Sequence, residues 1–163
     1  MAQHLEIEKK FLIKQPPAGW KRRASTRIEQ GYFPVADKNL EVRLRRKGAK
    51  HFITFKSGRA GFRTEEEVPI SARVFRALWP LTGSARIAKQ RYKIPCNGRT
   101  IEMDVYQGPH RGLMTAEIEF DSRRESHSFH APDWLGRDVT GKRQYANATL
   151  ARRGRAPRSR PHG

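Results

Sequence analysis

The chain has 163 residues, enough for one domain with a buried core. Its net charge is +18, with 34 Lys and Arg against 16 Asp and Glu, an excess that points to a polyanionic partner. The sequence has no apolar run long enough to span a membrane and no signal-peptide pattern, and its single cysteine, Cys96, excludes an internal disulfide and a cysteine metal cluster. We therefore expect a cytoplasmic protein.

Strands are predicted along most of the chain, because charged and apolar residues alternate in segment after segment. In the first, Glu6, Glu8 and Lys10 share one face, and Ile7 and Phe11 share the other. The predicted strands lie near residues 3–13, 26–34, 39–48, 50–57, 62–70, 85–95, 99–107 and 113–122.

The paired carboxylates of the first strand indicate a metal site. Glu6 and Glu8 repel each other unless a cation lies between them, and hard divalent cations prefer such oxygen ligands. Lys10, on the same face, suits a polyanion that the metal would also contact. The strand therefore predicts a site for metal and phosphate together.

The same charged face recurs on later strands, with the signs segregated. Bases dominate the middle strands and acids the early and late ones; the residues concerned are Arg43, Arg45, Lys56, Arg63, Glu65, Glu67, Lys89, Arg91, Lys93, Glu102, Asp104, Glu117 and Glu119. Such alternation usually means an antiparallel sheet with a solvated outer face. Because these faces are nearly pure charge, we favour the alternative that they turn inward.

The fold class that satisfies both faces is α+β, mainly antiparallel β: an eight-stranded closed barrel, or tunnel, with a charged lumen and helices covering its apolar outside. A helix is predicted over residues 71–79, with Ser71 as N-cap and Pro80 ending it. Further short helices are predicted around 133–135 and 145–152. Asn97-Gly98 predicts a hairpin turn.

The domain is predicted to cover residues 1–151. The remainder, 152–163, is rich in Arg, Pro and Gly and is expected to be a disordered tail. It is interpreted as a solubilising segment, with weak tethering to RNA or another polyanion as the alternative.

The charged motifs together resemble those of the triphosphate tunnel metalloenzymes, or CYTH domains, and are most similar to the short single-domain bacterial members. The resemblance covers residues 3 to about 150. It rests on Glu6-x-Glu8-x-Lys10, Arg43-Leu-Arg45, Thr54-Phe-Lys56, Arg63-x-Glu65-x-Glu67, Lys89-x-Arg-Tyr-Lys93, Glu102-Met-Asp104 and Ala116-Glu-Ile-Glu-Phe120.

The resemblance implies a hydrolase that cleaves a triphosphate with Mg²⁺ or Mn²⁺. The residues implied to bind phosphate are Lys10, Arg43, Arg45, Lys56, Lys89 and Arg91. Those implied to hold metal are Glu117 and Glu119 for a metal that bridges phosphates, and Glu6, Glu8 and Asp104 for a second metal and its water. Glu8, Glu6 and Lys10 are the implied catalytic residues, and Arg63, Glu65, Glu67 and Glu102 would line the lumen.

The expected reaction is hydrolysis of inorganic tripolyphosphate to pyrophosphate and phosphate by direct attack of water. A nucleoside or thiamine triphosphatase, an adenylyl cyclase and a non-catalytic RNA-binding module are the alternatives, and a homodimer is a further expectation. The sequence departs from the short bacterial pattern at Lys142 and Gln144, where an acid and an arginine are usual. Lys142 or Arg143 could therefore reach the terminal phosphate.

Overall fold

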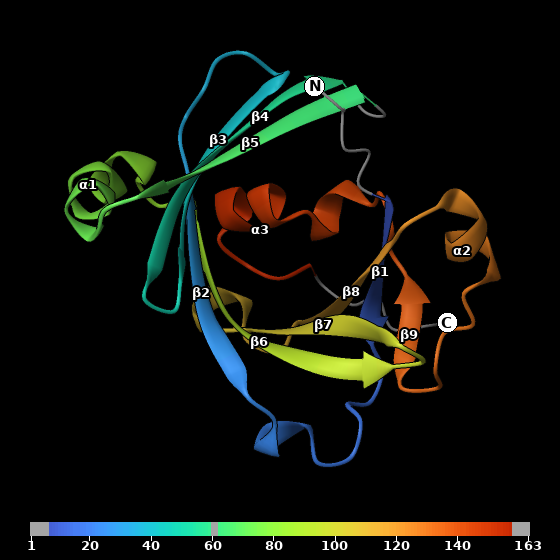
Figure 1. Cartoon of the computed structure of the whole chain (residues 1–163). Helices are drawn as coiled ribbons and strands as arrows, with labels where there is room; N and C mark the ends of the chain where they lie inside the picture. The colour runs from blue at the N-terminus through green and yellow to red at the C-terminus, as the bar shows by residue number, and fades with distance from the viewer. Residues whose placement is uncertain (1–6, 60–61, 158–163) are drawn as a thin grey trace.

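Strands dominate the computed structural model of this chain, which describes residues 7–59 and 62–157 (Figure 1). The strands are β1 (Ile7–Ile13), β2 (Ser25–Tyr32), β3 (Leu40–Lys47), β4 (Lys50–Arg59), β5 (Phe62–Ile70), β6 (Arg86–Cys96), β7 (Arg99–Tyr106), β8 (Met114–Phe120) and β9 (Leu135–Asp138). The α-helices are α1 (Ala72–Leu78), α2 (Arg123–Ser128) and α3 (Asn147–Arg153). Short 3-10 helices are η1 (Trp20–Arg22), η2 (Trp79–Thr82), η3 (Gly108–His110) and η4 (Arg143–Tyr145).

One antiparallel sheet contains all these strands, in the order β5-β4-β3-β2-β6-β7-β8-β1-β9. The mainly antiparallel prediction is confirmed, but the eight-stranded closed barrel is wrong. Residues 7–59 and 62–157 form nine strands, and no hydrogen-bonded ladder joins β5 to the far end of the sheet. The edge of β1 that does not pair with β8 pairs at Phe11 and Ile13 with β9, which the sequence did not predict, and not with β5.

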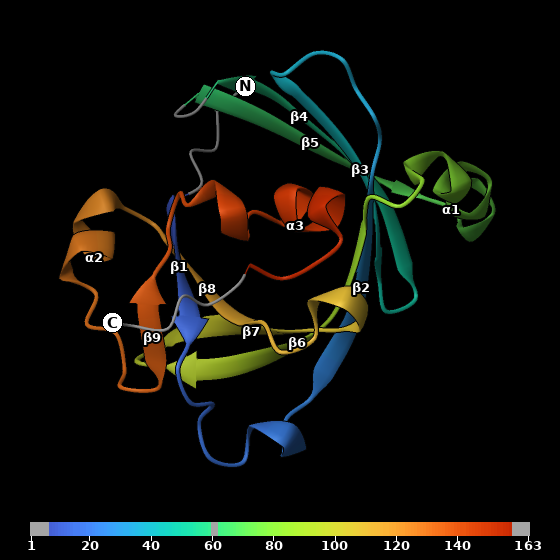
Figure 2. The same cartoon turned by 180° about the vertical axis from the view of Figure 1, so that it is seen from behind.

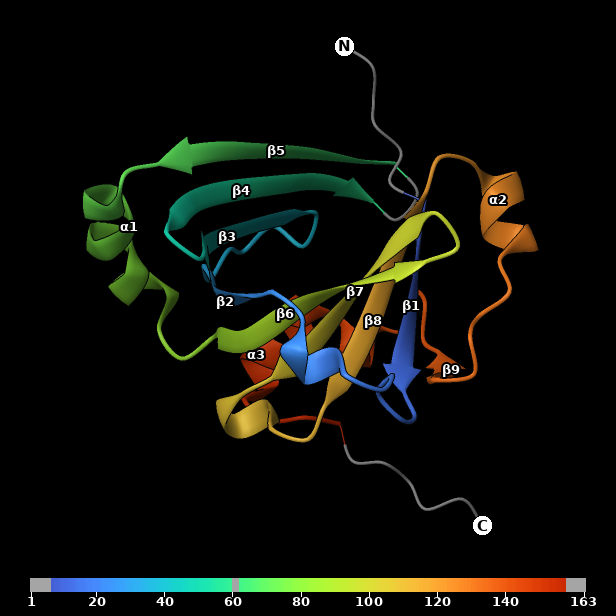
Figure 3. The ribbon, with the colours of Figure 1, turned by 60° about the horizontal axis from the view of Figure 1, so that its bottom comes forward.

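The sheet is nevertheless strongly curled. In Figures 1 and 2, β3, β4 and β5 face β6, β7 and β8 across α3, which lies on the concave side. α1 and α2 lie at opposite sides of the molecule (Figure 3). The concave face is therefore partly filled by the last helix.

Two apolar clusters cover the two faces of the sheet. The outer cluster, which includes Phe11, Ile101 and Ile118, packs against residues of β9 and of the segments around η1 and α2. The inner cluster joins α3 to the concave face through Tyr32, Ile87, Tyr106, Ala148, Leu150 and Ala151. The outer cluster confirms that the apolar faces of β1, β7 and β8 point away from the charged face.

The helix predicted over 71–79 is confirmed as α1, and Ser71 caps it by accepting a hydrogen bond from the Val74 amide. The short helix predicted around 133–135 is wrong: this segment is a turn that leads into β9, because Leu135 joins the outer apolar cluster beside β1. The helix predicted around 145–152 corresponds to α3, which ends at Arg153. α2 was not predicted.

The predicted hairpin turn at Asn97-Gly98 is confirmed. It joins β6 to β7 with positive φ angles of 48° and 76°, as a two-residue turn of this kind requires. No helix within residues 7–59 and 62–157 is long and apolar enough to cross a membrane.

Candidate active site

Strand register gathers the predicted site residues on the concave face. Directly opposed residues of an antiparallel pair share a face, and Lys10 opposes Glu117, which in turn opposes Glu102. Glu8 opposes Glu119 in the same way. The described members of the set are Glu8, Lys10, Arg43, Arg45, Lys56, Glu65, Glu67, Lys89, Arg91, Glu102, Asp104, Glu117 and Glu119.

Asp104 is the centre of the first half of the site, which β6, β7, β8 and β1 form. Its side chain is fully buried, and it accepts hydrogen bonds of 2.7 Å from both Nε and Nη2 of Arg91. The Lys89 ammonium donates a third bond, of 2.5 Å. These three hydrogen bonds orient the two bases.

Glu117 connects the centre of this half to β1. Its carboxylate lies 2.9 Å from Lys10 Nζ and 3.3 Å from Arg91 Nη2. Arg91 also pairs with Glu102 through Nη1. Lys10 and Arg91 are thus held about one carboxylate, which fixes both cations on the concave face.

The second half of the site lies on β3, β4 and β5. Arg43 lies 3.4 Å from Glu65, Lys56 lies 2.7 Å from the same carboxylate, and Arg45 pairs with Glu67. Glu65 and Glu67 therefore hold Arg43, Lys56 and Arg45 in place by ion pairing.

Opposing effects set the pKa values of these groups. Burial would raise the pKa of Glu117, but the charges of Lys10, Lys89 and Arg91 outweigh it and hold the pKa well below its usual range. Burial lowers the pKa of Lys89, and Asp104 opposes that change. Burial would lower the pKa of Arg91, but the hydrogen bond and charge of Asp104 raise it, so Arg91 stays cationic.

Tyr106 is buried beside these groups, with its pKa raised well above the usual range by burial and then by the charge of Asp104. Its hydroxyl donates a 2.6 Å hydrogen bond to Asn147 of α3. The last helix is thereby tied to the strand that carries Asp104, and it closes this end of the charged face.

The carboxylates fit a divalent cation in chemistry and in strand position. Glu8, Glu102, Glu117 and Glu119 supply hard oxygen donors from three neighbouring strands. In the described part of the chain, no three such side chains converge as a metal cluster. Glu102 and Glu117 instead contact Arg91 and Lys10, so metal binding would require them to exchange a cationic side chain for the ion.

Some predicted residues fall elsewhere. Glu6 lies outside the described residues, and so does the side chain of Arg63, although β5 places its backbone opposite Gly58. Lys142 and Arg143 are exposed at the start of η4. In the described residues, neither has an ion pair with the carboxylates of the site.

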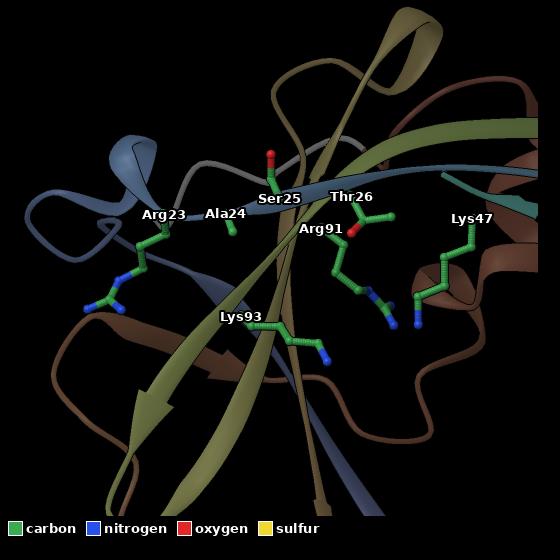
Figure 4. Close-up of a pocket in the computed structure, with 7 residues that line it drawn as sticks. All are labelled: Arg23, Ala24, Ser25, Thr26, Lys47, Arg91 and Lys93. Atoms are coloured by element: carbon green, nitrogen blue, oxygen red, sulfur yellow. The ribbon is translucent and has the colours of Figure 1, made fainter. Parts of the chain in front are cut away.

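A cavity that the sequence did not single out opens beside Arg91 (Figure 4). Its volume is about 350 Å³, and its lining residues are Arg23, Ala24, Ser25, Thr26, Lys47, Arg91 and Lys93. Lys47 continues the alternation Arg43-x-Arg45-x-Lys47, so the signal for it was present in the sequence. Arg23 and Thr26 had no such signal.

Comparison with known proteins identifies relatives over nearly the whole chain. The CYTH domain family matches residues 4–154. An inorganic triphosphatase of Nitrosomonas europaea is 38% identical over 148 residues, which cover 90% of this chain and 96% of that protein. An inorganic triphosphatase of Acetivibrio thermocellus is 36% identical over 151 residues, or 90% and 93% of the two chains.

A solved structure agrees with the sequence relatives. The crystal structure of an inorganic triphosphatase superimposes with a TM-score of 0.72 and 36% identity, covering 93% of this chain and 95% of that chain. A conserved hypothetical protein from Pyrococcus furiosus, with 23% identity and a TM-score of 0.54 over 76% and 83% of the chains, shares the fold alone.

Proposed function

The chain belongs to the CYTH domain family, and on that premise we propose that it hydrolyses inorganic tripolyphosphate to pyrophosphate and phosphate with a divalent metal, Mg²⁺ or Mn²⁺. The observation that carries the proposal is the concave face itself. Six bases, Lys10, Arg43, Arg45, Lys56, Lys89 and Arg91, share it with carboxylates that fix their positions.

Phosphoryl transfer depends on positioning and on neutralising charge rather than on covalent chemistry. In the proposed mechanism, Arg43, Arg45 and Lys56 hold phosphate oxygens from one side of the face. Lys10, Lys89 and Arg91 hold them from the other. Each of these bases is already oriented by a carboxylate before the substrate binds.

We assign the metal to carboxylates of β1 and β8. Glu117 and Glu119 would hold one divalent metal, and Glu8, with Glu6, would hold a second. A bound divalent cation would supply positive charge at the phosphate oxygens and acidify a water. For Asp104, which the resemblance implied as a further ligand, we propose instead that it orients Lys89 and Arg91, which donate hydrogen bonds to its oxygens.

The proposed chemical step is direct in-line attack of water on the terminal phosphorus. A new P–O bond forms, the bridging P–O bond breaks, and pyrophosphate leaves with its charge neutralised by the bases. Glu8 accepts the proton of the attacking water. No covalent phosphoenzyme is required, because the assigned groups bind and orient without acting as nucleophiles.

An inorganic substrate is favoured over a nucleotide by the cavity beside Arg91. None of its seven lining residues is aromatic, so none offers a ring on which a base could stack. A non-catalytic RNA-binding role leaves the carboxylates unexplained, since acids in a polyanion groove repel the ligand. Contact of nucleic acid with the basic C-terminal segment, a cytoplasmic location and a homodimer remain secondary proposals.

The test is phosphate release from tripolyphosphate, ATP and thiamine triphosphate, each with Mg²⁺, Mn²⁺ or EDTA. We expect metal-dependent release from tripolyphosphate well above the others, lost in Glu8→Gln and in Glu119→Gln. Glu66→Gln is the matched control, because Glu66 lies on the opposite face of β5 from Glu65 and Glu67. If no phosphate is released from any of the three substrates, and anions bind equally with and without EDTA, the protein is not a hydrolase.

A further inference from the structure

Gln30 is a buried amide at the boundary between the charged face and the inner apolar cluster. Its side chain is 2% exposed. Tyr32, two residues further along β2, and Ile87, directly opposite on β6, belong to the inner cluster. On its other side, Gln30 lies directly opposite Arg45 of β3. Gln30 therefore shares the concave face with the bases assigned to phosphate.

Two complementary polar atoms of this pair are buried and unpaired. Within residues 7–59 and 62–157, neither Oε1 of Gln30 nor Nε of Arg45 has a hydrogen-bond partner. The amide oxygen accepts hydrogen bonds and the Nε–H group donates one. Because directly opposed side chains start about 5 Å apart at Cβ, rotation of the side chains can bring the two atoms together.

The burial of this amide is unfavourable in the arrangement that the structure shows. A polar group removed from water without a hydrogen bond costs free energy, and an apolar side chain of the same length would avoid that cost. Gln30 is flanked on its own strand by Ile28 and Tyr32, which are both buried and apolar on the same face. The amide is therefore explained better by a second arrangement of the site, in which its oxygen is paired.

Arg45 is held from one side only. Its Nη2 pairs with Glu67, which lies on β5, and the strand order places Glu67 and Gln30 on opposite sides of Arg45. The Arg45 side chain is 20% exposed although its Nε is buried, so other atoms of the side chain reach solvent. A phosphate that binds the guanidinium competes with the carboxylate of Glu67, whereas the neutral amide of Gln30 does not repel it.

We infer that Gln30 is a positioning residue for substrate binding, whose Oε1 accepts the Nε hydrogen of Arg45 while the two Nη groups bind a phosphate. The inference rests on the proposed function and adds a neutral residue to its substrate site. Contact at Nε leaves the Nη1 and Nη2 end of the planar guanidinium as the fork that phosphate oxygens match. A guanidinium fixed in this way loses less conformational freedom when phosphate binds.

The test measures binding of inorganic tripolyphosphate by calorimetry in EDTA, so that no metal-dependent turnover occurs. Gln30→Met keeps the length of the side chain and removes both polar atoms. Gln90→Met is the matched control, because Gln90 lies between Lys89 and Arg91 on β6 and so faces away from the site. We expect Kd to rise about tenfold in Gln30→Met, from the loss of one hydrogen bond to a charged group, and to stay unchanged in Gln90→Met.

Two further measurements separate positioning from a structural role. Thermal unfolding of the free protein should not occur at a lower temperature in Gln30→Met, because the amide that is removed has no partner there. Arg45→Lys keeps the positive charge but lacks the Nε hydrogen. In that background Gln30→Met should cause no further loss of affinity, so the two substitutions should be non-additive.

Several outcomes would overturn the positioning role: an unchanged Kd in Gln30→Met, additive losses with Arg45→Lys, or a lower unfolding temperature in Gln30→Met. Phosphate release from tripolyphosphate with Mg²⁺ tests the proposed function separately. A wild type that hydrolyses tripolyphosphate with the same KM as Gln30→Met refutes the positioning role alone. A wild type that binds without hydrolysis, and binds more tightly than Gln30→Met, refutes the hydrolase alone, and a wild type that does neither refutes both.

Discussion

Asp104 holds Arg91 by two parallel hydrogen bonds, from Nε and Nη2, each 2.7 Å long, on a strand position with no exposure to solvent. The same carboxylate accepts the Lys89 ammonium. Two bases proposed to bind phosphate thus depend on one acid for their orientation. A buried charge of this kind is costly to leave unpaired.

Asp104→Asn is expected to destabilise the protein by about 3 kcal/mol, because it leaves Lys89 and Arg91 buried with their principal counter-charge removed. For a domain of this size the unfolding temperature should fall by about 10 °C. Thermal denaturation measures this loss. Glu102→Gln removes the same charge from a side chain that is 29% exposed and contacts Arg91 alone among the described bases, so its effect should be smaller.

The variant Asp104→Asn also distinguishes two roles of Asp104, the positioning of bases and the binding of metal. If Asp104 orients bases, Asp104→Asn should raise KM for tripolyphosphate while the Mg²⁺ concentration that gives half-maximal rate stays unchanged. If that concentration rises at least about tenfold, as loss of a ligand or its support predicts, Asp104 is a ligand and the positioning role is wrong.

Lys10→Met should lower kcat/KM for tripolyphosphate by about 100-fold, since it removes a cation aimed at charge that develops in the reaction. Its neighbour provides the control. Lys9 opposes Ile118 and shares the outer face with Phe11, so Lys9→Met should leave kcat/KM unchanged. Steady-state rates of phosphate release measure both, and equal losses in the two variants would contradict the assignment.

Much of the charged face could be predicted from the sequence, because the alternation of side chains along a strand assigns each residue to one of the two faces. In a strand, every second residue points the same way, so Glu8 and Lys10, or Glu65 and Glu67, must share a side once the segment is extended. The apolar residues between them, such as Phe11, are found on the other side, in the outer cluster.

Which acid meets which base could not be predicted. A register shift of two residues keeps every side chain on its face but changes every partner. The pairing of Asp104 with both Lys89 and Arg91 depends on Arg91 lying directly opposite Asp104, a property of the folded ladder. The expected metal role of Asp104 came from the family pattern and did not include these partners.

Short elements account for the other errors. β9 has four residues and no alternation, so nothing in its sequence distinguishes it from a turn. α2 did have a signal, because Ser122-Arg-Arg-Glu125 is a capping-box sequence and Ser122 accepts the Glu125 amide. β9 pairs with the edge of β1 at which a closed barrel would have required β5.

The lowered pKa of Glu67 makes the stability of the protein depend on pH. Burial would raise its pKa, but the hydrogen bond and charge of Arg45 lower it overall. A carboxyl whose pKa is lower in the folded than in the unfolded state contributes stability above the unfolded pKa, and this is lost as pH falls through the folded pKa. The loss should begin below about pH 4.

Glu67→Gln should therefore reduce stability at pH 7 and flatten the fall in stability below about pH 4. Urea denaturation at a series of pH values measures the free energy of unfolding. Glu66→Gln, on the opposite face of β5, should keep the wild-type pH dependence. If the free energy of unfolding of Glu67→Gln falls below about pH 4 as steeply as that of wild type, the ion pair of Glu67 with Arg45 contributes no pH-dependent stability.

Substitution of Gly31, at the junction of β2 and η2, is expected to change stability and not activity. A Cβ at this position would lie 2.7 Å from Oγ1 and 2.8 Å from Cγ2 of Thr82, closer than real contacts allow. Thr82 cannot turn away easily, because its hydroxyl donates to the Trp79 carbonyl at 2.8 Å and accepts from Arg86 at 2.9 Å. Gly31→Ala should cost about 2 kcal/mol of stability.

A double-mutant cycle tests whether this clash is the cause. Thr82→Ala removes the two nearest atoms, so the cost of Gly31→Ala should be smaller in that background than in wild type, by about 1 kcal/mol or more. Urea denaturation of the four proteins gives the coupling energy. Strict additivity would mean that contact with Oγ1 and Cγ2 of Thr82 is not responsible; Cβ of Thr82, at 2.9 Å, is retained in Thr82→Ala. The rate per folded molecule should not change, since Gly31 opposes Leu44 and Arg86 rather than any of the bases assigned to phosphate.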